Sequence, residues 1–282
     1  MYDAPMPPDA RARVELMLSL AERAGAVALG YFQSEHLAVD SKPDESPVTE
    51  ADRAIESLLR NEIRAAFPQD AVLGEEHGEI AGSSGFRWVI DPIDGTVSFS
   101  TGVPLFGTLI GLEFRDRIVA GICSMPALGE RVWASRGGGA WWERRRPDGS
   151  MHRSPARVRR CERLADALVC TSGLEYFERA RATDSLVRVA RASRRIRGWS
   201  DCYAGMLVAT GRCDAWFDPV MHPWDSGPFP VILAEAGGVF TDWRGREDIR
   251  GGSAVACHAA VHRELLALVQ PSVSHLPSNA NA

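Results

Sequence analysis

The sequence predicts a layered α+β protein, and three observations support this class. Apolar residues at helical spacing alternate along the chain with short runs rich in β-branched and aromatic residues. The alternation lacks the strict strand–helix–strand rhythm of a parallel α/β fold. The 282 residues are 45% hydrophobic and 24% charged, which is ordinary for a globular chain that buries a large core.

Two amphipathic helices open the predicted fold, over residues 9–32 and 49–67. The second has a start signal, because Thr49 is followed by acidic side chains in the first helical turn. Residues 39–48 between them hold two prolines and four charged residues, so we expect an exposed loop there. The strands expected next cover residues 86–90, 105–112, 118–124 and 131–134, and a polar turn follows at 144–149.

The second half of the chain mixes both kinds of element. We expect strands over residues 168–171, 215–218 and 253–256, and helices around 174–192, 203–210 and 259–268. A further helix is expected to end at Ala236, because Gly237 and Gly238 form a stop signal. We expect an N-terminal α+β half over residues 1–150, a C-terminal half over 151–270 and a flexible tail over 271–282.

Charge and lysine content argue against several classes of protein. The net charge of −5 disfavours a nucleic-acid-binding protein, and no apolar run approaches the roughly 20 residues that span a membrane. Lys42 is the only lysine, so a P-loop is absent and a Schiff base could use only that residue. No G-x-G-x-x-G motif follows an apolar strand. Nucleotide kinases, pyridoxal enzymes and common dehydrogenases are therefore disfavoured.

The cysteines and the first residues bear on location. Six cysteines are scattered without a C-x-x-C pair, which is typical of small buried side chains in a reducing compartment. The first ten residues are rich in proline and lack the basic and apolar regions of a secretory leader. We therefore expect a cytoplasmic protein.

The most informative stretch is Trp88–Thr96, with the sequence WVIDPIDGT. An apolar strand brings Asp91 to its end, where Pro92 cannot continue the ladder. Residues three apart on an extended strand face opposite sides, but the proline and glycine here allow a turn that brings Asp91 and Asp94 around one point. Two carboxylates that close repel unless a cation lies between them, and oxygen ligands without Cys or His indicate Mg²⁺. A solvated turn without a cation is the alternative.

Two further acids occupy similar settings. Glu75 follows the short apolar run Val72–Gly74, and Asp225 begins the helix that is expected to end at Ala236. Taken alone, Glu75 could be a surface acid and Asp225 a helix N-cap. Together with the two acids of WVIDPIDGT they form a set of four carboxylates that solvation explains poorly.

These motifs resemble the three signatures of the inositol monophosphatase superfamily of Mg²⁺-dependent, lithium-sensitive phosphatases. The matching stretches, in chain order, are Gly74–Glu76, Asp91–Thr96, and Trp224–Asp225 followed by Glu235–Gly238. The resemblance runs from about Val48 to Leu268. It implies a layered αβαβα sandwich, a phosphomonoesterase with two or three Mg²⁺ ions, and a homodimer that could use aromatic residues near Trp141 and Trp142.

The resemblance also implies a set of metal ligands. Glu75, Asp91 and the backbone carbonyl of Ile93 would hold one Mg²⁺. Asp91, Asp94 and Asp225 would hold a second. The metal-binding motifs thus fall mostly in the N-terminal half, and the C-terminal half completes the site.

Catalytic roles follow from the same resemblance. Asp52, in a segment that resembles the family's, would orient water on a weaker third ion together with Glu75. Asp52 and Thr96 would polarise the attacking water. Backbone N–H groups of Gly95 and Thr96 would bind phosphate oxygens.

Two departures from the family pattern concern the substrate side of the pocket. Val97 stands where the family usually has Asn or Lys. After Asp225, an Ala-rich turn is replaced by Ser226–Pro228 with Pro230 close behind. A proline in the first helical turn is tolerated, whereas we expect Pro230 to delay or distort the helix. Neither change removes a ligand.

Within the superfamily, the sequence resembles the histidinol-phosphate phosphatase branch more than the inositol branch. The stretches that carry this resemblance are Lys42–Asp44 with Ser46–Thr49, Phe106–Ile110, Trp199–Tyr203 and Gly251–Val255. We expect Asp201 and Asp218 to line the pocket for the alcohol part of the substrate. The alternatives are a helix N-cap for Asp201 and a strand-end turn for Asp218.

The resemblance therefore implies hydrolysis of histidinol phosphate, a step of histidine synthesis, with a small phosphomonoester as the partner and no nucleic acid or membrane. Three alternatives stay open from the sequence. They are an inositol-1-monophosphatase or broad sugar-phosphate phosphatase, a 3′-phosphoadenosine nucleotidase, and an inactive regulatory protein.

Overall fold

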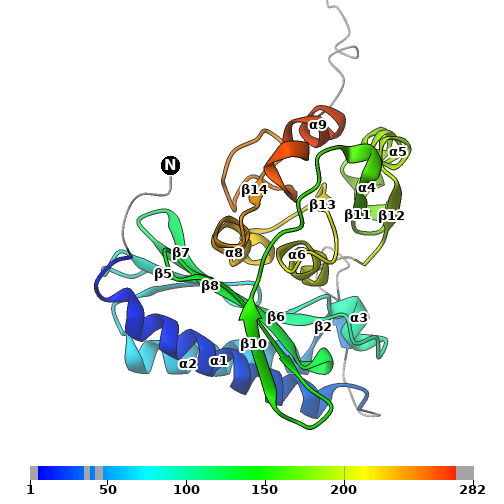
Figure 1. The fold of residues 1–282 in the computed structure, drawn as a ribbon. Helices are drawn as coiled ribbons and strands as arrows, with labels where there is room; N and C mark the ends of the chain where they lie inside the picture. The colour runs from blue at the N-terminus through cyan, green and yellow to red at the C-terminus, as the bar shows by residue number, and fades with distance from the viewer. Residues whose placement is uncertain (1–5, 35–38, 42–46, 200, 271–282) are drawn as a thin grey trace, which may run out of the picture.

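The computed structural model describes residues 6–34, 39–41, 47–199 and 201–270. These residues form successive layers of helices and sheets (Figure 1). From one face to the other, the layers are helices α1 and α2, an eight-stranded sheet, helices α6 and α8, a five-stranded sheet, and helices α4, α5 and α9. The predicted layered αβαβα class is confirmed.

The outer helices α1 (Ala10–Tyr31) and α2 (Glu50–Ala66) lie where the sequence predicts them. Their apolar sides pack on the eight-stranded sheet. A capping box begins α2, because Thr49 Oγ1 accepts a hydrogen bond from the Asp52 backbone and the Asp52 carboxylate accepts one from the Thr49 N–H. This cap fixes Asp52 at the start of the helix.

The eight-stranded sheet has the order β10-β9-β8-β7-β6-β5-β3-β4, and only the β3–β5 pair is parallel among its described strands. Its strands are β3 (Ala71–Gly74), β4 (Gly78–Ile80), β5 (Phe86–Asp94), β6 (Gly107–Phe114), β7 (Arg117–Met125), β8 (Glu130–Ser135), β9 (Gly139–Arg145) and β10 (Met151–Pro155). The polar turn predicted at residues 144–149 connects β9 and β10. The sheet extends to Pro155, past residue 150, and the division into halves stays a prediction.

The five-stranded sheet has the order β12-β11-β13-β15-β14. Its strands are β11 (Leu168–Cys170), β12 (Arg195–Arg197), β13 (Ala215–Asp218), β14 (Val239–Thr241) and β15 (Ala254–Cys257). Three of them match the predicted strands closely. The two three-residue strands at the edges, β12 and β14, are too short to show a periodic pattern in the sequence.

Two sequence-based expectations about local structure are wrong. Residues 39–48 are not simply a loop, since β1 (Val39–Ser41) and β2 (Pro47–Thr49) form an antiparallel ribbon. The helix expected over residues 174–192 is two helices, α4 (Leu174–Arg179) and α5 (Thr183–Ala192). The break lies at Arg181, whose φ of 55° is left-handed and cannot continue a right-handed helix. Lys42–Asp44, part of the histidinol-phosphatase resemblance, lies outside the described residues.

The helix expected to end at Ala236 is also divided, into α7 (Pro223–Ser226) and α8 (Phe229–Glu235). Pro230 is the second residue of α8, a position where a backbone N–H would have no intrahelical partner, so the proline is tolerated there. The helix begins only at Phe229, which agrees with the expected delay. The connection between α7 and α8, at Gly227 and Pro228, packs directly on two glycines of the eight-stranded sheet. A Cβ on Gly111 would lie 2.7 Å from the Gly227 carbonyl oxygen, and one on Gly121 would lie 2.6 Å from Pro228 Cα.

The remaining helices in the described residues close the layers. They are α6 (Cys202–Ala209) between the sheets, α9 (Ala259–Val269) on the outside, and the short α3 (Thr96–Ser100) after β5. All six cysteines are buried and unbridged, as the sequence predicts. No helix in the described part of the chain has the length and apolar character needed to cross a membrane.

Candidate active site

A cavity of about 690 Å³ opens where β5, α3, α4, α6 and α7 meet. Nearly all residues that the sequence predicts for the site line it. They are Glu75, Asp91, Ile93, Asp94, Gly95, Thr96, Asp201, Asp218 and Asp225. Asp52 is the exception, because it is fully buried and lies behind Thr96.

Strand β5 brings Asp91 and Asp94 together by a route that differs from the predicted turn. The strand continues through Pro92 to Asp94 instead of ending at Asp91. Asp91 pairs with Leu109 and Asp94 with Gly107, so β5 contains one more residue than β6 over this stretch. Such a bulge re-aims side chains, and it removes the alternation that would put the two acids on opposite faces.

Gly95 follows the bulge and begins α3 with a left-handed φ of 85°. A Cβ at this position would lie 2.9 Å from the Leu105 carbonyl oxygen, which is closer than ordinary contact. Glycine is therefore required here by both conformation and space. The tight turn directs the start of α3 toward the cavity.

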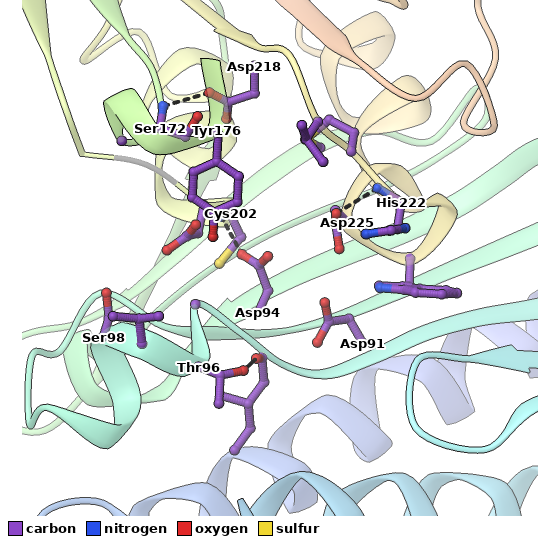
Figure 2. A pocket seen from close by; sticks show the side chains of 18 of the residues that line it. Asp91, Asp94, Thr96, Ser98, Ser172, Tyr176, Cys202, Asp218, His222 and Asp225 are labelled. Atoms are coloured by element: carbon purple, nitrogen blue, oxygen red, sulfur yellow. Dashed lines mark hydrogen bonds between the residues drawn. The ribbon is translucent and has the colours of Figure 1, made fainter. Parts of the chain in front are cut away.

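Three carboxylates converge at the floor of the cavity. Asp91, Asp94 and Asp225 each place one oxygen within 4.8 Å of the others, and Figure 2 shows all three pointing into the same space. The Asp225 carboxylate accepts a hydrogen bond of 2.7 Å from the His222 N–H, and Asp94 accepts one from the Cys202 N–H. Asp91 Oδ1 is buried and accepts no hydrogen bond from a described residue. This orphaned oxygen is an available ligand atom.

The electrostatics of this cluster oppose its ionisation in the absence of a cation. Burial, followed by the charges of Glu75 and Asp94, raises the pKa of Asp91 well above its ordinary value. Burial and the charge of Asp201 do the same for the pKa of Asp94, and burial raises the pKa of Asp225 to about 8. Within the described ranges, no arginine or histidine forms an ion pair with Asp91, Asp94 or Asp225. A hard divalent cation such as Mg²⁺ fits this all-oxygen donor set.

Thr96 lies between the cavity and the buried carboxylate of Asp52. Its hydroxyl donates to the Ile93 carbonyl oxygen at 3.0 Å and lies 3.5 Å from Asp52 Oδ1. Burial raises the pKa of Asp52 to about 6, although hydrogen bonds from Thr49 oppose the shift. The second Asp52 oxygen is engaged by Thr49, so the carboxylate is fixed with one oxygen toward Thr96.

Comparison with known proteins agrees with this geometry. A family model described as the inositol monophosphatase family matches residues 10–275. The chain belongs to the inositol monophosphatase family. The sequence resemblance to this family, drawn from the three motifs, is thereby confirmed.

Individual relatives cover almost the whole chain. The chain is 41% identical to a histidinol-phosphatase of Chlorobaculum parvum over 257 residues, which span 91% of this chain and 96% of that protein. It is 39% identical to a histidinol-phosphatase of Streptomyces coelicolor over 263 residues, 92% of this chain and 97% of that one. Its fold is similar to the crystal structure of the extragenic suppressor protein SuhB from Bartonella henselae, with a TM-score of 0.82, 29% identity, and coverage of 93% and 100%.

In this member of the family, the two acids expected on the alcohol side of the pocket have different surroundings. The Asp218 carboxylate accepts hydrogen bonds from Ser172 N, Thr171 Oγ1 and Trp216 Nε1, at 2.6, 3.1 and 2.6 Å. These bonds tie together the ends of β11 and β13, and burial raises the pKa of Asp218 to about 6. A substrate contact by Asp218 stays a prediction, and its carboxylate already has three donors.

Asp201 has a more accessible position. It precedes α6 but makes no side-chain cap, and its Oδ2 lies 3.1 Å from where a Cβ on Gly95 would be. Its φ of 53° and ψ of −154° are unusual for any residue except glycine. This strained backbone places Asp201 against Gly95 and aligns the next N–H, from Cys202, with Asp94.

Helix α4 supplies cavity residues that the sequence analysis missed, namely Glu175, Tyr176 and Arg179. Figure 2 shows the Tyr176 ring entering the cavity. Burial raises the pKa of Tyr176 to about 12, with smaller contributions from the charges of Asp201 and Glu175. No sequence motif identifies α4 as part of the site. The only indication is that α4 follows β11, which pairs in parallel with β13, the strand that ends at Asp218.

Proposed function

We propose that this protein is a Mg²⁺-dependent histidinol-phosphatase of the inositol monophosphatase family. The observation that carries the hydrolase chemistry is the convergence of Asp91, Asp94 and Asp225 around one point, with a buried, unsatisfied oxygen on Asp91. The substrate follows from the relatives named histidinol-phosphatase, at 39–41% identity over about nine tenths of the chain.

The ligand assignment uses the residues that face the cavity. Glu75, Asp91 and the Ile93 carbonyl would hold one Mg²⁺, Asp91, Asp94 and Asp225 would hold a second, and Glu75 and Asp52 would orient water on a weaker third ion. Bound Mg²⁺ supplies positive charge against the phosphoryl oxygens and lowers the pKa of water. The support is the oxygen-only donor set and the raised pKa values of the acids, which a divalent cation would reverse.

The chain's own residues position the reactants. With its proton directed toward the Ile93 carbonyl, Thr96 Oγ1 keeps a lone pair that can accept a hydrogen bond from the attacking water. As the water attacks, it passes a proton to Thr96 Oγ1, and the Thr96 hydroxyl turns to pass its own proton to Asp52 Oδ1, which lies 3.5 Å away. The N–H groups of Gly95 and Thr96, at the turn into α3, bind the phosphate oxygens.

The opposite wall of the cavity recognises the alcohol. Histidinol phosphate carries an ammonium group, and the wall contains the acids Asp201 and Glu175 beside the Tyr176 ring. Acidic side chains attract the ammonium and accept hydrogen bonds from it, whereas inositol phosphate has only neutral hydroxyl groups beyond its phosphate.

A comparison of substrates tests the proposal. We expect kcat/KM for histidinol phosphate to exceed that for inositol-1-phosphate by at least about tenfold, which corresponds to about 1.4 kcal/mol. p-Nitrophenyl phosphate serves as a substrate without an ammonium group. Equal values for histidinol phosphate and inositol-1-phosphate would contradict the substrate assignment, and no hydrolysis of any of the three with Mg²⁺ would contradict the enzyme class.

Three further expectations belong to this proposal. Inhibition by millimolar Li⁺ is expected from the family, with a potency that Val97 could change.

A homodimer is expected, although the indole N–H groups of Trp141 and Trp142 donate hydrogen bonds within the chain, to the Gly138 carbonyl oxygen and to Glu130. Light scattering that shows a particle of one chain's mass, 30.8 kDa, would contradict it. The cytoplasmic location stays a prediction.

A further inference from the structure

Helix α2 carries a buried acid, Glu56, that bonds to the loop after β3. Its side chain is fully buried. Glu56 Oε2 accepts a hydrogen bond of 2.7 Å from the Glu76 N–H, and Oε1 accepts one of 3.1 Å from the His77 N–H. The carboxylate therefore holds the backbone of the two residues that follow Glu75.

Arg60, one helical turn later, completes this contact. Its Nε donates to Glu56 Oε1 at 2.7 Å, and its Nη2 donates to the Gly78 carbonyl oxygen. The pair thus binds three consecutive residues, Glu76 to Gly78, through two N–H groups and one carbonyl oxygen. Because Arg60 balances the charge of Glu56, the pair adds no net charge beside the acidic cavity. We call these two residues the α2 brace.

The braced loop lies directly beside the proposed metal ligands. Strand β3 pairs in parallel with β5, with Gly74 opposite Ile90, so the loop begins next to Asp91. Its first residue, Glu75, lines the cavity. The approach of the brace is tight, since a Cβ on Gly74 would lie 2.4 Å from Glu56 Oε1 and 2.8 Å from Arg60 Nη2.

We propose that Glu56 is a positioning residue of the metal site, which directs Glu75 toward Asp91 by fixing the backbone of Glu76 and His77. The proposal rests on the proposed function, in which Glu75 is a ligand. Substitution of a residue with no role beyond folding would change stability alone, whereas substitution of a positioning residue also changes the affinity for Mg²⁺.

The matched control is Asp70, at the other end of the same strand. Its side chain is also fully buried and paired with an arginine, through a contact of 2.7 Å from Arg13 Nε. It precedes β3, whereas Glu75 follows the strand, and it does not line the cavity. Asp70→Asn and Glu56→Gln are therefore equivalent changes to a buried pair, and only the second lies at the site.

The test is Mg²⁺ titration of substrate-free protein by calorimetry. We expect Glu56→Gln to weaken Mg²⁺ binding by about tenfold, an amount equivalent to about 1.4 kcal/mol. At saturating Mg²⁺, kcat should recover most of its wild-type value, and Asp70→Asn should bind Mg²⁺ as the wild type does. Arg60→Lys keeps the positive charge but loses the hydrogen bond from the guanidinium group to the Gly78 carbonyl oxygen. It should weaken Mg²⁺ binding less than Glu56→Gln does, and it replaces Glu56→Gln in the test if that variant fails to fold.

Two results would overturn the positioning role. One is wild-type Mg²⁺ affinity in Glu56→Gln, or in Arg60→Lys where only that variant folds. The other is an equal weakening in Asp70→Asn, which would show a general effect of stability. Failure of the proposed function has a different signature, because wild-type protein would then bind Mg²⁺ without hydrolysing histidinol phosphate. Wild-type protein that binds no Mg²⁺ would overturn both.

Discussion

Strand β3 has one buried acid, Asp70, before its start and the acidic cluster of the cavity beyond its end, and these differ in the source of their positive charge. At the start of the strand, Asp70 accepts hydrogen bonds from Arg13, Ser84 and Trp88 at 2.7 to 2.9 Å. Burial alone would raise the pKa of Asp70, but these bonds outweigh it and lower the pKa below its ordinary value. Beyond the other end of the strand, the pKa values of Asp91 and Asp94 are strongly raised.

The difference separates a structural carboxylate from a ligand set. Asp70 has its counter-ion within the chain, so its charge contributes to folding without any ligand. Asp91, Asp94 and Asp225 have no arginine partner in the parts of the chain that the structure describes, so a cation from outside would favour their ionised state. A buried acid with a counter-ion in the chain therefore indicates a structural role. Asp91, Asp94 and Asp225 form no such ion pair among the described residues, and their raised pKa values in a cavity indicate a functional role.

The largest expected effect is on the free energy of unfolding, when the Asp70–Arg13 pair before β3 is broken. Asp70→Asn leaves Arg13 buried without its counter-charge, and breaking a buried pair costs about 3–5 kcal/mol. Urea denaturation measures the loss of unfolding free energy, and activity per folded molecule should be unchanged. A loss below about 1 kcal/mol, typical of an exposed pair, would show that the buried pair of Asp70 and Arg13 does not stabilise the fold.

At the cavity, the same type of substitution should raise the stability of the metal-free protein instead of lowering it. Asp94→Asn removes one of several repelling charges, so the metal-free protein should be more stable than the wild type. It should also lose more than about 90% of turnover at saturating Mg²⁺, since a tenfold loss is only about 1.4 kcal/mol and a lost ligand costs more. Asp225→Asn should behave in the same way. Either variant with more than a tenth of wild-type activity would contradict the ligand assignment.

A smaller effect is expected on substrate choice. Asp201→Asn removes a charge from the alcohol side of the cavity, and charge-assisted hydrogen bonds contribute about 1.5–3 kcal/mol. The ratio of kcat/KM between histidinol phosphate and inositol-1-phosphate should fall, while p-nitrophenyl phosphate hydrolysis stays nearly constant. Asn has nearly the same shape as Asp, so the substitution should preserve the backbone conformation at residue 201. Loss of all three activities together would instead assign Asp201 a structural role.

The smallest expected effect concerns acid stability. Because the pKa of Asp70 is lower in the folded than in the unfolded protein, its stabilisation is present above the unfolded value of about 3.9 and is lost as the pH falls through the folded value. Between about pH 5 and pH 2, wild-type protein should lose stability more steeply than Asp70→Asn. Parallel slopes for the two proteins would indicate that Asp70 does not titrate differently in the two states.

Much of the fold and several of the cavity acids could be predicted from the sequence, because each motif lies within a short stretch of the chain. The spacing of WVIDPIDGT identified Asp91 and Asp94 as a pair, and Thr49 identified the start of α2. The means of pairing was mispredicted, since a bulge depends on the register between β5 and β6, which no single strand encodes. The contribution of α4 and the α2 brace were also missed, because both depend on contacts between segments distant in the sequence.

Thermal unfolding of chelator-treated protein, with and without added Mg²⁺, tests most directly whether the cavity acids need an external cation. A ligand that binds only the folded state stabilises it by about 2.7 kcal/mol at one hundred times its Kd. We therefore expect Mg²⁺ to raise the Tm of the wild type and of Asp70→Asn by similar amounts, and to raise that of Asp94→Asn little or not at all. An unchanged Tm in the wild type, or an equal rise in Asp94→Asn, would contradict the account.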